Sequence, residues 1–129
     1  MELAGQADVI VNALPLTAAT EGLFDDEFFA AAKRGAIFIS VGRGRSTDTD
    51  ALVAALQSGQ LGGAGLDVTD PEPLPADHPL WKMDNVIISP HVAGFGGGSD
   101  RHRVLVTENL RRFIAGEPLY NVVDPDKGY

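Results

Sequence analysis

The chain has 129 residues, of which 44% are hydrophobic and 22% charged, enough apolar material for one domain with its own core. Its formal net charge of −8 argues against binding nucleic acid or an anionic membrane through bulk electrostatics. With 0 cysteines, it can form neither a disulfide nor a thiolate metal site.

The N-terminal residues show no basic segment followed by an apolar run, so no secretion signal is predicted. No apolar stretch approaches the length needed to span a membrane. We therefore expect a cytoplasmic protein with neither nucleic acid nor membrane as a partner.

The first predicted strand covers residues 8–14 and ends at Pro15, because proline cannot donate to a sheet ladder. Asp25 or Asp26 is expected to cap a helix at its N-terminus, and Gly35 stands where a C-terminal cap belongs.

The second strand, residues 36–41, is apolar on both faces, which is typical of a central strand in a parallel sheet. The turn Gly42-Arg43-Gly44 follows, and its glycines permit backbone conformations closed to other residues. A polar segment at residues 46–50 is expected to cap the next helix, which ends at Gly59.

The glycine-rich residues 63–68 form a third predicted strand, followed by a four-proline loop at residues 70–79 that Leu80 and Trp81 are expected to anchor. Residues 86–89 form the fourth strand. Ser99 is expected to cap a last helix that Gly116 closes, before an extended tail.

Alternation of strands and helices predicts an α/β fold with a mostly parallel sheet. The glycine-rich turn that holds pyrophosphate at the start of a dinucleotide fold is missing, so the pattern indicates the second half of a doubly wound, Rossmann-like domain. Residues 1–95 are assigned to this domain, and residues 96–129 to a C-terminal helix and tail.

Chemistry-bearing residues follow three of the strands: Arg43 after the second, Asp67 and then Glu72 after the third, and His91 after the fourth. Parallel strands place such residues at one edge of the sheet, where ligands bind. An arginine can hold the carboxylate of a 2-keto acid, a histidine can exchange a proton with its oxygen, and a glutamate can orient the imidazole.

Each residue also has a structural explanation when taken singly. Arg43 suits a solvated turn, Asp67 a strand-end turn, Glu72 an acidic surface, and His91 a histidine with satisfied hydrogen bonds. A metal site built from the three histidines is discounted, because their spacing fits no ligand motif.

The ordered motifs closely resemble the D-2-hydroxyacid dehydrogenase family, which includes phosphoglycerate dehydrogenase, glyoxylate/hydroxypyruvate reductase and formate dehydrogenase. The resemblance runs from about Ala7 to Tyr120, and it implies that residues 96–129 return toward the family's substrate domain. Its segments are Asn12-Ala13-Leu14-Pro15-Leu16-Thr17, Gly42-Arg43-Gly44 with Asp48, Gly65-Leu66-Asp67-Val68, Pro71-Glu72-Pro73-Leu74 and Asn85 to Gly94.

The resemblance implies an oxidoreductase that moves a hydride between NAD(P)H and a 2-keto or D-2-hydroxy acid, with NAD or NADP as cofactor and a homodimer at full length. It implies that the catalytic residues are Arg43, Glu72 and His91, and that Asp67 binds the nicotinamide carboxamide. The implied cofactor-binding positions are Leu14, Pro15, Val41, Gly42, Arg43, Asp67, His91, Ala93 and Gly94.

Two departures from the family pattern shape these expectations. Residues 95–98 intervene where the family continues into a helix, and the family's first half is absent. We therefore expect residues 1–129 alone to be inactive and to expose the apolar sides of Val9, Val11, Ile37 and Ile39. The alternatives are an NAD-sensing module resembling the C-terminal-binding-protein corepressors, and a truncated fragment that survives as a dimerisation unit.

Overall fold

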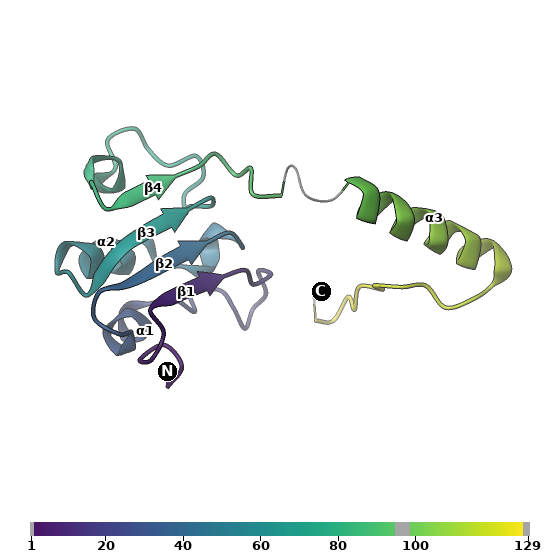
Figure 1. The fold of residues 1–129 in the computed structure, drawn as a ribbon, viewed down its shortest axis with the longest axis horizontal. Coiled ribbons are helices and arrows are strands. Elements are labelled where there is room, and N and C mark those ends of the chain that lie inside the picture. The colour runs from purple at the N-terminus through teal and green to yellow at the C-terminus, as the bar shows by residue number, and fades with distance from the viewer. Residues whose placement is uncertain (1, 95–98, 128–129) are drawn as a thin grey trace. The chain divides into compact units, whose positions relative to one another are not determined.

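The computed structural model describes residues 2–94 and 99–127, and the chain divides into two compact units, Met1–His91 and Val92–Tyr129. The first unit contains a parallel sheet with helices, and the second a long helix and a tail (Figure 1). No helix within the described ranges is long and apolar enough to cross a membrane. The predicted boundary between residues 95 and 96 lies outside the described residues and stays a prediction.

The sheet of the first unit has four parallel strands in the spatial order β1-β2-β3-β4, so each strand pairs with the one that follows it in sequence. The strands are β1 (Val9–Asn12), β2 (Ala36–Ser40), β3 (Leu61–Leu66) and β4 (Val86–Ile88). The connections contain α1 (Asp26–Ala31), the 3₁₀ helix η1 (Gly44–Ser46), α2 (Thr49–Gln57) and the 3₁₀ helix η2 (Pro79–Lys82). The predicted α/β class is confirmed.

The helices α1 and α2 of the first unit begin at aspartate caps, as the sequence indicated. Asp25 accepts a hydrogen bond from the backbone N–H of Phe28 at 2.8 Å, and Asp48 accepts two from the first turn of α2. The expectation for Gly35 was wrong, because α1 already ends at Ala31. Gly35 instead has a φ of 81° in the turn that leads into β2, a conformation that favours glycine.

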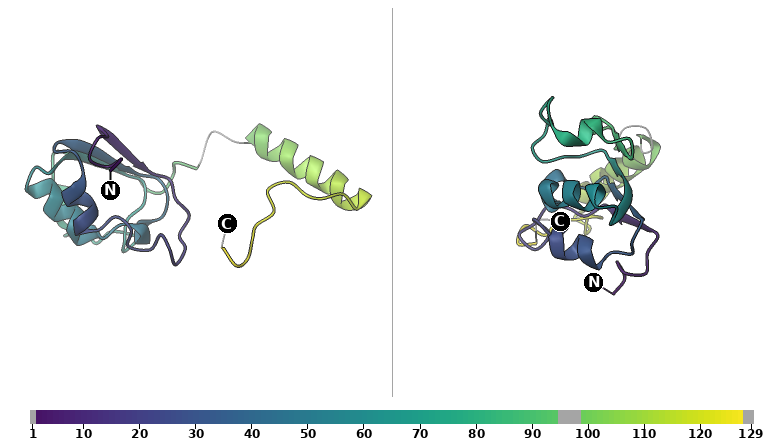
Figure 2. Two further views of the ribbon diagram at one scale, coloured as in Figure 1. Left: turned by 90° about the horizontal axis from the view of Figure 1, so that it is seen from below. Right: turned by 90° about the vertical axis from the view of Figure 1, so that its left-hand side faces the viewer.

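One face of the sheet is covered by α1 and α2, and the core of the unit lies between them and the sheet (Figure 2). Phe38 on β2 is completely buried, and its ring centroid lies 5.2 Å from those of Phe24 and Phe29. Edge-to-face geometry between Phe29 and Phe38 adds to the stability gained by burying their area.

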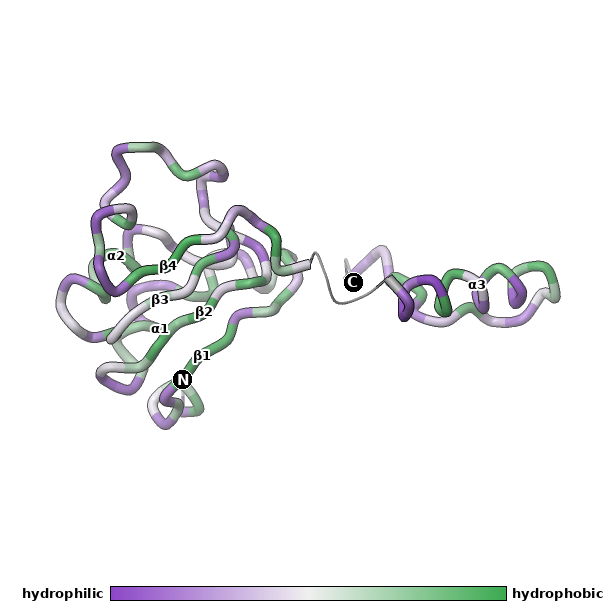
Figure 3. Tube along the Cα trace, turned by 45° about the horizontal axis from the view of Figure 1, so that its top comes forward, coloured by the Kyte–Doolittle hydropathy of each residue, from purple (hydrophilic) through white to green (hydrophobic). Residues whose placement is uncertain are grey.

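Within the described residues of the first unit, no helix lies over the opposite face of the sheet. Val11 is 58% exposed, Ile37 38% and Ile87 77%, while the alternate residues of β2 are buried. β2 is an inner strand of the parallel sheet, as its apolar pattern indicated. The expected exposure of Val9, Val11 and Ile37 is confirmed, and Ile39 is half-buried. Figure 3 shows this hydrophobic run along β1 and β2.

Leu80 and Trp81 hold the proline-rich loop after β3 in two different ways. Leu80 is buried in the core, but Trp81 is about half exposed. The indole N–H of Trp81 donates to the carbonyl of Pro75 at 2.9 Å, so the ring braces the loop from outside.

The second unit contains α3 (Ser99–Ala115), which ends before Gly116 at a φ of 68°. Arg111 pairs with Glu108 and Glu117, and the guanidinium of Arg112 lies 3.8 Å from the ring centroid of Tyr120. The part of the tail that the structure describes, residues 117–127, forms neither helix nor strand.

Candidate active site

Residues predicted to carry chemistry lie where the strands end. Arg43 follows β2, Asp67 follows β3, and His91 stands three residues after β4. Because β2, β3 and β4 are parallel neighbours, these positions share the carboxyl edge of the sheet. Glu72 reaches the same edge from the loop that follows Asp67.

The pair that this edge forms most clearly is Glu72 and His91. Their Oε1 and Nδ1 atoms lie 2.7 Å apart, which is hydrogen-bonding distance. His91 has a φ of 53°, a left-handed conformation that is uncommon for residues other than glycine. Strain of this kind persists where the surrounding structure enforces it, and it is found most often at functional sites. The side chain of His91 is 45% exposed and that of Glu72 is 41% exposed, so Nε2 of the imidazole can contact a ligand.

Asp67 is the buried carboxylate of the site, only 6% exposed. The hydroxyl of Ser89 donates to its Oδ1 at 2.5 Å, and Asp67 N donates to the carbonyl of Ser40 at 2.9 Å. Ser89 lies in the family motif Asn85 to Gly94, but the sequence pattern did not predict a role for it. Its signal was a hydroxyl directly after the apolar run Val86–Ile88, at the edge where ligands bind.

A cavity of about 350 Å³ joins these groups. Asp67, Glu72, Ser89 and His91 line it, together with Leu74 and Trp81. Arg43 is not among the lining residues, and its Nη1 donates to the carbonyl of Gly42 at 2.9 Å. The structure therefore brings three of the predicted residues together and leaves the arginine folded onto its own turn.

The glycines around Arg43 are needed for a different reason from the one expected. Neither Gly42 nor Gly44 has a positive φ. A Cβ at Gly42 would lie 2.7 Å from the carbonyl oxygen of Leu14, and one at Gly44 would lie 1.9 Å from that of Thr69. Close backbone approach therefore requires glycine, and it joins the arginine turn to the segments that follow β1 and β3.

The remaining predicted cofactor positions divide between the two units. Leu14 and Val41 are partly exposed, and Pro15 is exposed, where β1 and β2 end. Ala93 and Gly94 belong to the second unit, Val92–Tyr129, and their part in the site stays a prediction.

His78 lies outside this site and caps the 3₁₀ helix η2. Its Nδ1 accepts a hydrogen bond from Leu80 N at 3.3 Å at the start of η2. Within residues 2–94 and 99–127, no three His, Cys, Asp or Glu side chains are grouped so as to hold a metal ion.

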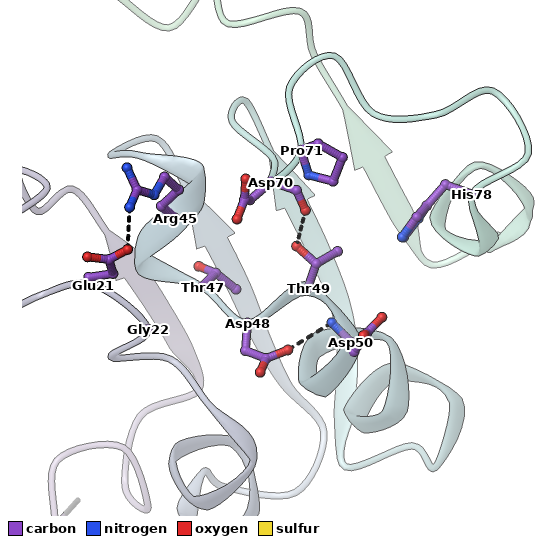
Figure 4. Close-up of a pocket in the computed structure, with 10 residues that line it drawn as sticks. All are labelled: Glu21, Gly22, Arg45, Thr47, Asp48, Thr49, Asp50, Asp70, Pro71 and His78. Carbon is purple, nitrogen blue, oxygen red and sulfur yellow. Dashed lines mark hydrogen bonds and ion pairs between the residues drawn. The ribbon is translucent and has the colours of Figure 1, made fainter.

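A larger and more polar cavity, about 520 Å³, lies beside the N-terminus of α2 (Figure 4). Glu21 and Arg45 pair with each other at one side, and the hydroxyl of Thr49 donates to the carbonyl of Asp70 at 2.7 Å. None of the predicted site residues lines this cavity. Its acidic side chains are already used in part by the chain itself, since Asp48 caps α2.

Comparisons with known proteins agree with the geometry. The family described as "D-isomer specific 2-hydroxyacid dehydrogenase, NAD binding domain" matches residues 1–93. A human protein named glyoxylate reductase/hydroxypyruvate reductase is 46% identical over 124 residues, which cover 92% of this chain and 36% of that protein. The chain spans about two fifths of the length of the curated relatives it matches.

Two solved structures resemble the chain closely. A D-isomer specific 2-hydroxyacid dehydrogenase from Xanthobacter autotrophicus Py2, in complex with NADPH and MES, aligns with a TM-score of 0.90 at 44% identity, covering 99% of this chain and 52% of that one. An NADPH-dependent glyoxylate/hydroxypyruvate reductase from Sinorhizobium meliloti aligns at 0.88 and 40% identity, covering 99% and 42%. The chain belongs to the NAD-binding domain family of the D-isomer specific 2-hydroxyacid dehydrogenases.

Proposed function

We propose that this chain supplies the nicotinamide-side and catalytic part of an NAD(P)H-dependent oxidoreductase that interconverts a 2-keto acid and a D-2-hydroxy acid. The observation that carries the proposal is the 2.7 Å contact between Glu72 and His91 in the same cavity as the buried Asp67. A histidine whose second nitrogen is held by a carboxylate is equipped for proton transfer.

The residues fit the nicotinamide end of a dinucleotide. A buried carboxylate such as Asp67, fixed by Ser89, is a good acceptor for the N–H groups of a carboxamide. Leu14, Pro15, Val41 and Gly42 would line the cofactor where β1 and β2 end. When bound, the nicotinamide supplies or accepts the hydride. The glycine-containing turn after β2 leads into the 3₁₀ helix η1, so within the described ranges no strand passes through a glycine-rich turn directly into an α-helix that could hold pyrophosphate.

Side chains of this chain transfer the proton to and from the substrate. In reduction, His91 donates its Nε2 proton to the keto oxygen while the carbonyl carbon gains the hydride, and a hydroxyl group results. In oxidation, the neutral ring takes that proton back. Glu72 accepts the hydrogen bond from Nδ1–H, which keeps Nε2 aimed at the substrate and stabilises the charged ring.

Arg43 completes the proposed site once it leaves the carbonyl of Gly42 and turns to the substrate. Its planar guanidinium can bind the substrate carboxylate through two parallel hydrogen bonds. It also places positive charge near the oxygen that becomes negative during reduction.

The names of the relatives support this assignment. The human relative is named for glyoxylate and hydroxypyruvate, and the Xanthobacter structure holds NADPH. NAD or NADP as cofactor, a small 2-keto or 2-hydroxy acid as substrate, a homodimer and a cytoplasmic location belong to the same proposal.

A chimera tests the proposal. In it, this chain replaces the matching segment of the human relative, and consumption of NADPH or NADH is followed with glyoxylate and hydroxypyruvate. We expect turnover that depends on both the 2-keto acid and the cofactor. A folded chimera that binds the cofactor but turns over neither acid would contradict the proposed reaction.

The 129 residues by themselves provide the complementary test. Their described part shows no pyrophosphate cradle, and one sheet face of the first unit carries exposed apolar side chains, so we expect weak dinucleotide binding, no turnover and a tendency to associate. Calorimetry with NADH and NADPH measures the binding. Micromolar affinity and measurable turnover would show that the remainder of the family fold is dispensable.

A further inference from the structure

A polar side chain stands where the apolar strand β1 ends. Asn12 follows Val9, Ile10 and Val11, and it is completely buried. A buried amide without hydrogen bonds destabilises the folded state, so the partners of Asn12 show its role. Those partners come from the turn that carries Arg43.

The Asn12 amide uses both ends of its dipole. Its Oδ1 accepts from Leu14 N at 3.2 Å. Its Nδ2 donates to Oγ of Ser46 at 2.7 Å and to Oγ of Ser40 at 3.0 Å. The reverse orientation would set an NH₂ group against the N–H of Leu14, so the contacts determine which atom is nitrogen.

The branch through Ser46 reaches the arginine. The hydroxyl of Ser46 donates to the backbone carbonyl of Arg43 at 2.6 Å, and Ser46 N approaches the same oxygen at 3.2 Å. Ser46 is also completely buried, although Arg43 itself is exposed. The branch through Ser40 ends on β2 and makes no contact with Arg43 through its side chain.

We infer that Asn12 is a positioning residue for Arg43, acting through Ser46, and that it ties the arginine turn to the Leu14–Pro15 segment proposed to line the cofactor. The part that concerns catalysis rests on the proposed function. An exposed arginine can be aimed reproducibly only if its backbone is held, and this buried chain of hydrogen bonds holds it.

The two serines give a matched experiment, since both are buried and both accept one hydrogen bond from Asn12. Ser46→Ala breaks the link to Arg43, whereas Ser40→Ala breaks only the other branch. In the 129-residue chain, we expect the ¹⁵N backbone order parameters of Arg43 and Gly44 to fall from about 0.85 to below about 0.6 in Ser46→Ala and to stay high in Ser40→Ala. Unchanged values in both variants, or equal falls, would overturn the inference.

The active chimera supplies the second readout. Ser46→Ala should raise the KM for the 2-keto acid about fivefold, the effect of roughly one hydrogen bond, with the KM for NADPH and kcat much less changed. Ser40→Ala should leave the KM for the acid unchanged. A KM for the acid that is the same in both variants would overturn the catalytic part. An inactive chimera would count against the proposed function, while the order parameters still decide whether the link through Ser46 holds the turn.

Discussion

The two compact units are built from similar apolar patterns with opposite results. In Met1–His91, Phe29 and Phe38 are 1% and 0% exposed, because a sheet and two helices enclose them. In Val92–Tyr129, Phe113 and Ile114 are 71% and 78% exposed on a single helix. Helical spacing of apolar residues produces a helix in both units, but burial needs a second layer to pack against.

The difference also separates two kinds of polar contact. In the first unit, buried groups such as Asn12 and Asp67 lie where strands end and are held by short side-chain hydrogen bonds. In the second, Arg111 and its glutamate partners lie at the surface, where ion pairs contribute little to stability. Matched substitutions, each a residue with an assigned role beside a similar residue without one, test this contrast.

The largest expected effect is on the core. Phe38→Ala in the 129-residue chain should lower the free energy of unfolding by about 3–5 kcal/mol, because it leaves a cavity among the rings of Phe24 and Phe29. Phe113→Ala should change it by less than about 0.5 kcal/mol. Denaturant unfolding followed by circular dichroism measures both. Equal losses would mean that Phe113 is packed in solution.

The second prediction contrasts two histidines. His91→Gln in the chimera should lower kcat for 2-keto acid reduction by about 10²-fold or more, the usual contribution of a positioned acid. His102→Gln on α3 should leave kcat unchanged. Steady-state kinetics with saturating NADPH gives the comparison. A His91→Gln enzyme that keeps parental kcat would remove His91 from the proton transfer.

The partner of His91 is tested in the same way. Glu72→Gln should lower kcat, by about tenfold or more, because the amide no longer fixes the ring with a charged acceptor. Asp77→Asn is the control, since Asp77 is an exposed acid of the same loop. Equal kinetics for the two variants would show that the 2.7 Å contact has no part in catalysis.

A smaller effect is expected for the arginine. Arg43→Lys should lower kcat/KM by about ten- to a hundredfold, the loss of one charge-assisted hydrogen bond, because an ammonium lacks the planar fork. Arg45→Lys, two residues away and paired with Glu21, should have little effect. Near-parental kinetics for Arg43→Lys would mean that another group binds the substrate carboxylate.

The smallest expected effect is that of low pH on the ion pairs of the second unit. A hydrogen bond from Arg111 lowers the pKa values of Glu108 and Glu117 below their ordinary 4.5. Carboxyls with a lowered pKa stabilise the folded state above the ordinary value, and this contribution is lost as the pH falls through the lowered one. The contact of the tail with α3 should therefore loosen slightly below pH 4.5. Carboxyl ¹³C titration should show both pKa values rising in Arg111→Gln and unchanged in Arg103→Gln; a Glu108 that titrates at 4.5 in the parent chain would contradict the pairing.

Much of the fold could be predicted because its signals are local. Asp25 and Asp48 stand directly before the residues whose N–H groups they accept from, and the alternation of apolar strands with helices predicts the α/β class. The candidate site was predictable in composition, since Asp67 and His91 follow parallel strands. The direction of the Arg43 side chain was not predictable, because a side chain at a turn has several hydrogen-bond acceptors within reach. In the structure it donates to the carbonyl of Gly42.

Some predicted reasons were wrong even where the residue was right. Gly42 was expected to need an unusual backbone conformation, but it needs room for Leu14, which is remote in sequence. Asn12 was quoted as part of a motif without a role, because its hydroxyl partners lie 28 and 34 residues away. The sequence signal for these partners was only the position of a polar residue, Asn12, at the end of an apolar strand.

The sequence by itself placed the N-terminal caps of α1 and α2 to within a few residues, and it indicated the type of each main element and, through the order of its motifs, the family. These depend on neighbouring residues and on their succession along the chain. Tertiary structure alone decided which sheet face stays exposed, that His91 adopts a left-handed backbone beside Glu72, and that Asn12 and Ser46 hold the arginine turn. Each of these depends on atoms distant in sequence, whose meeting depends on how the strands pair.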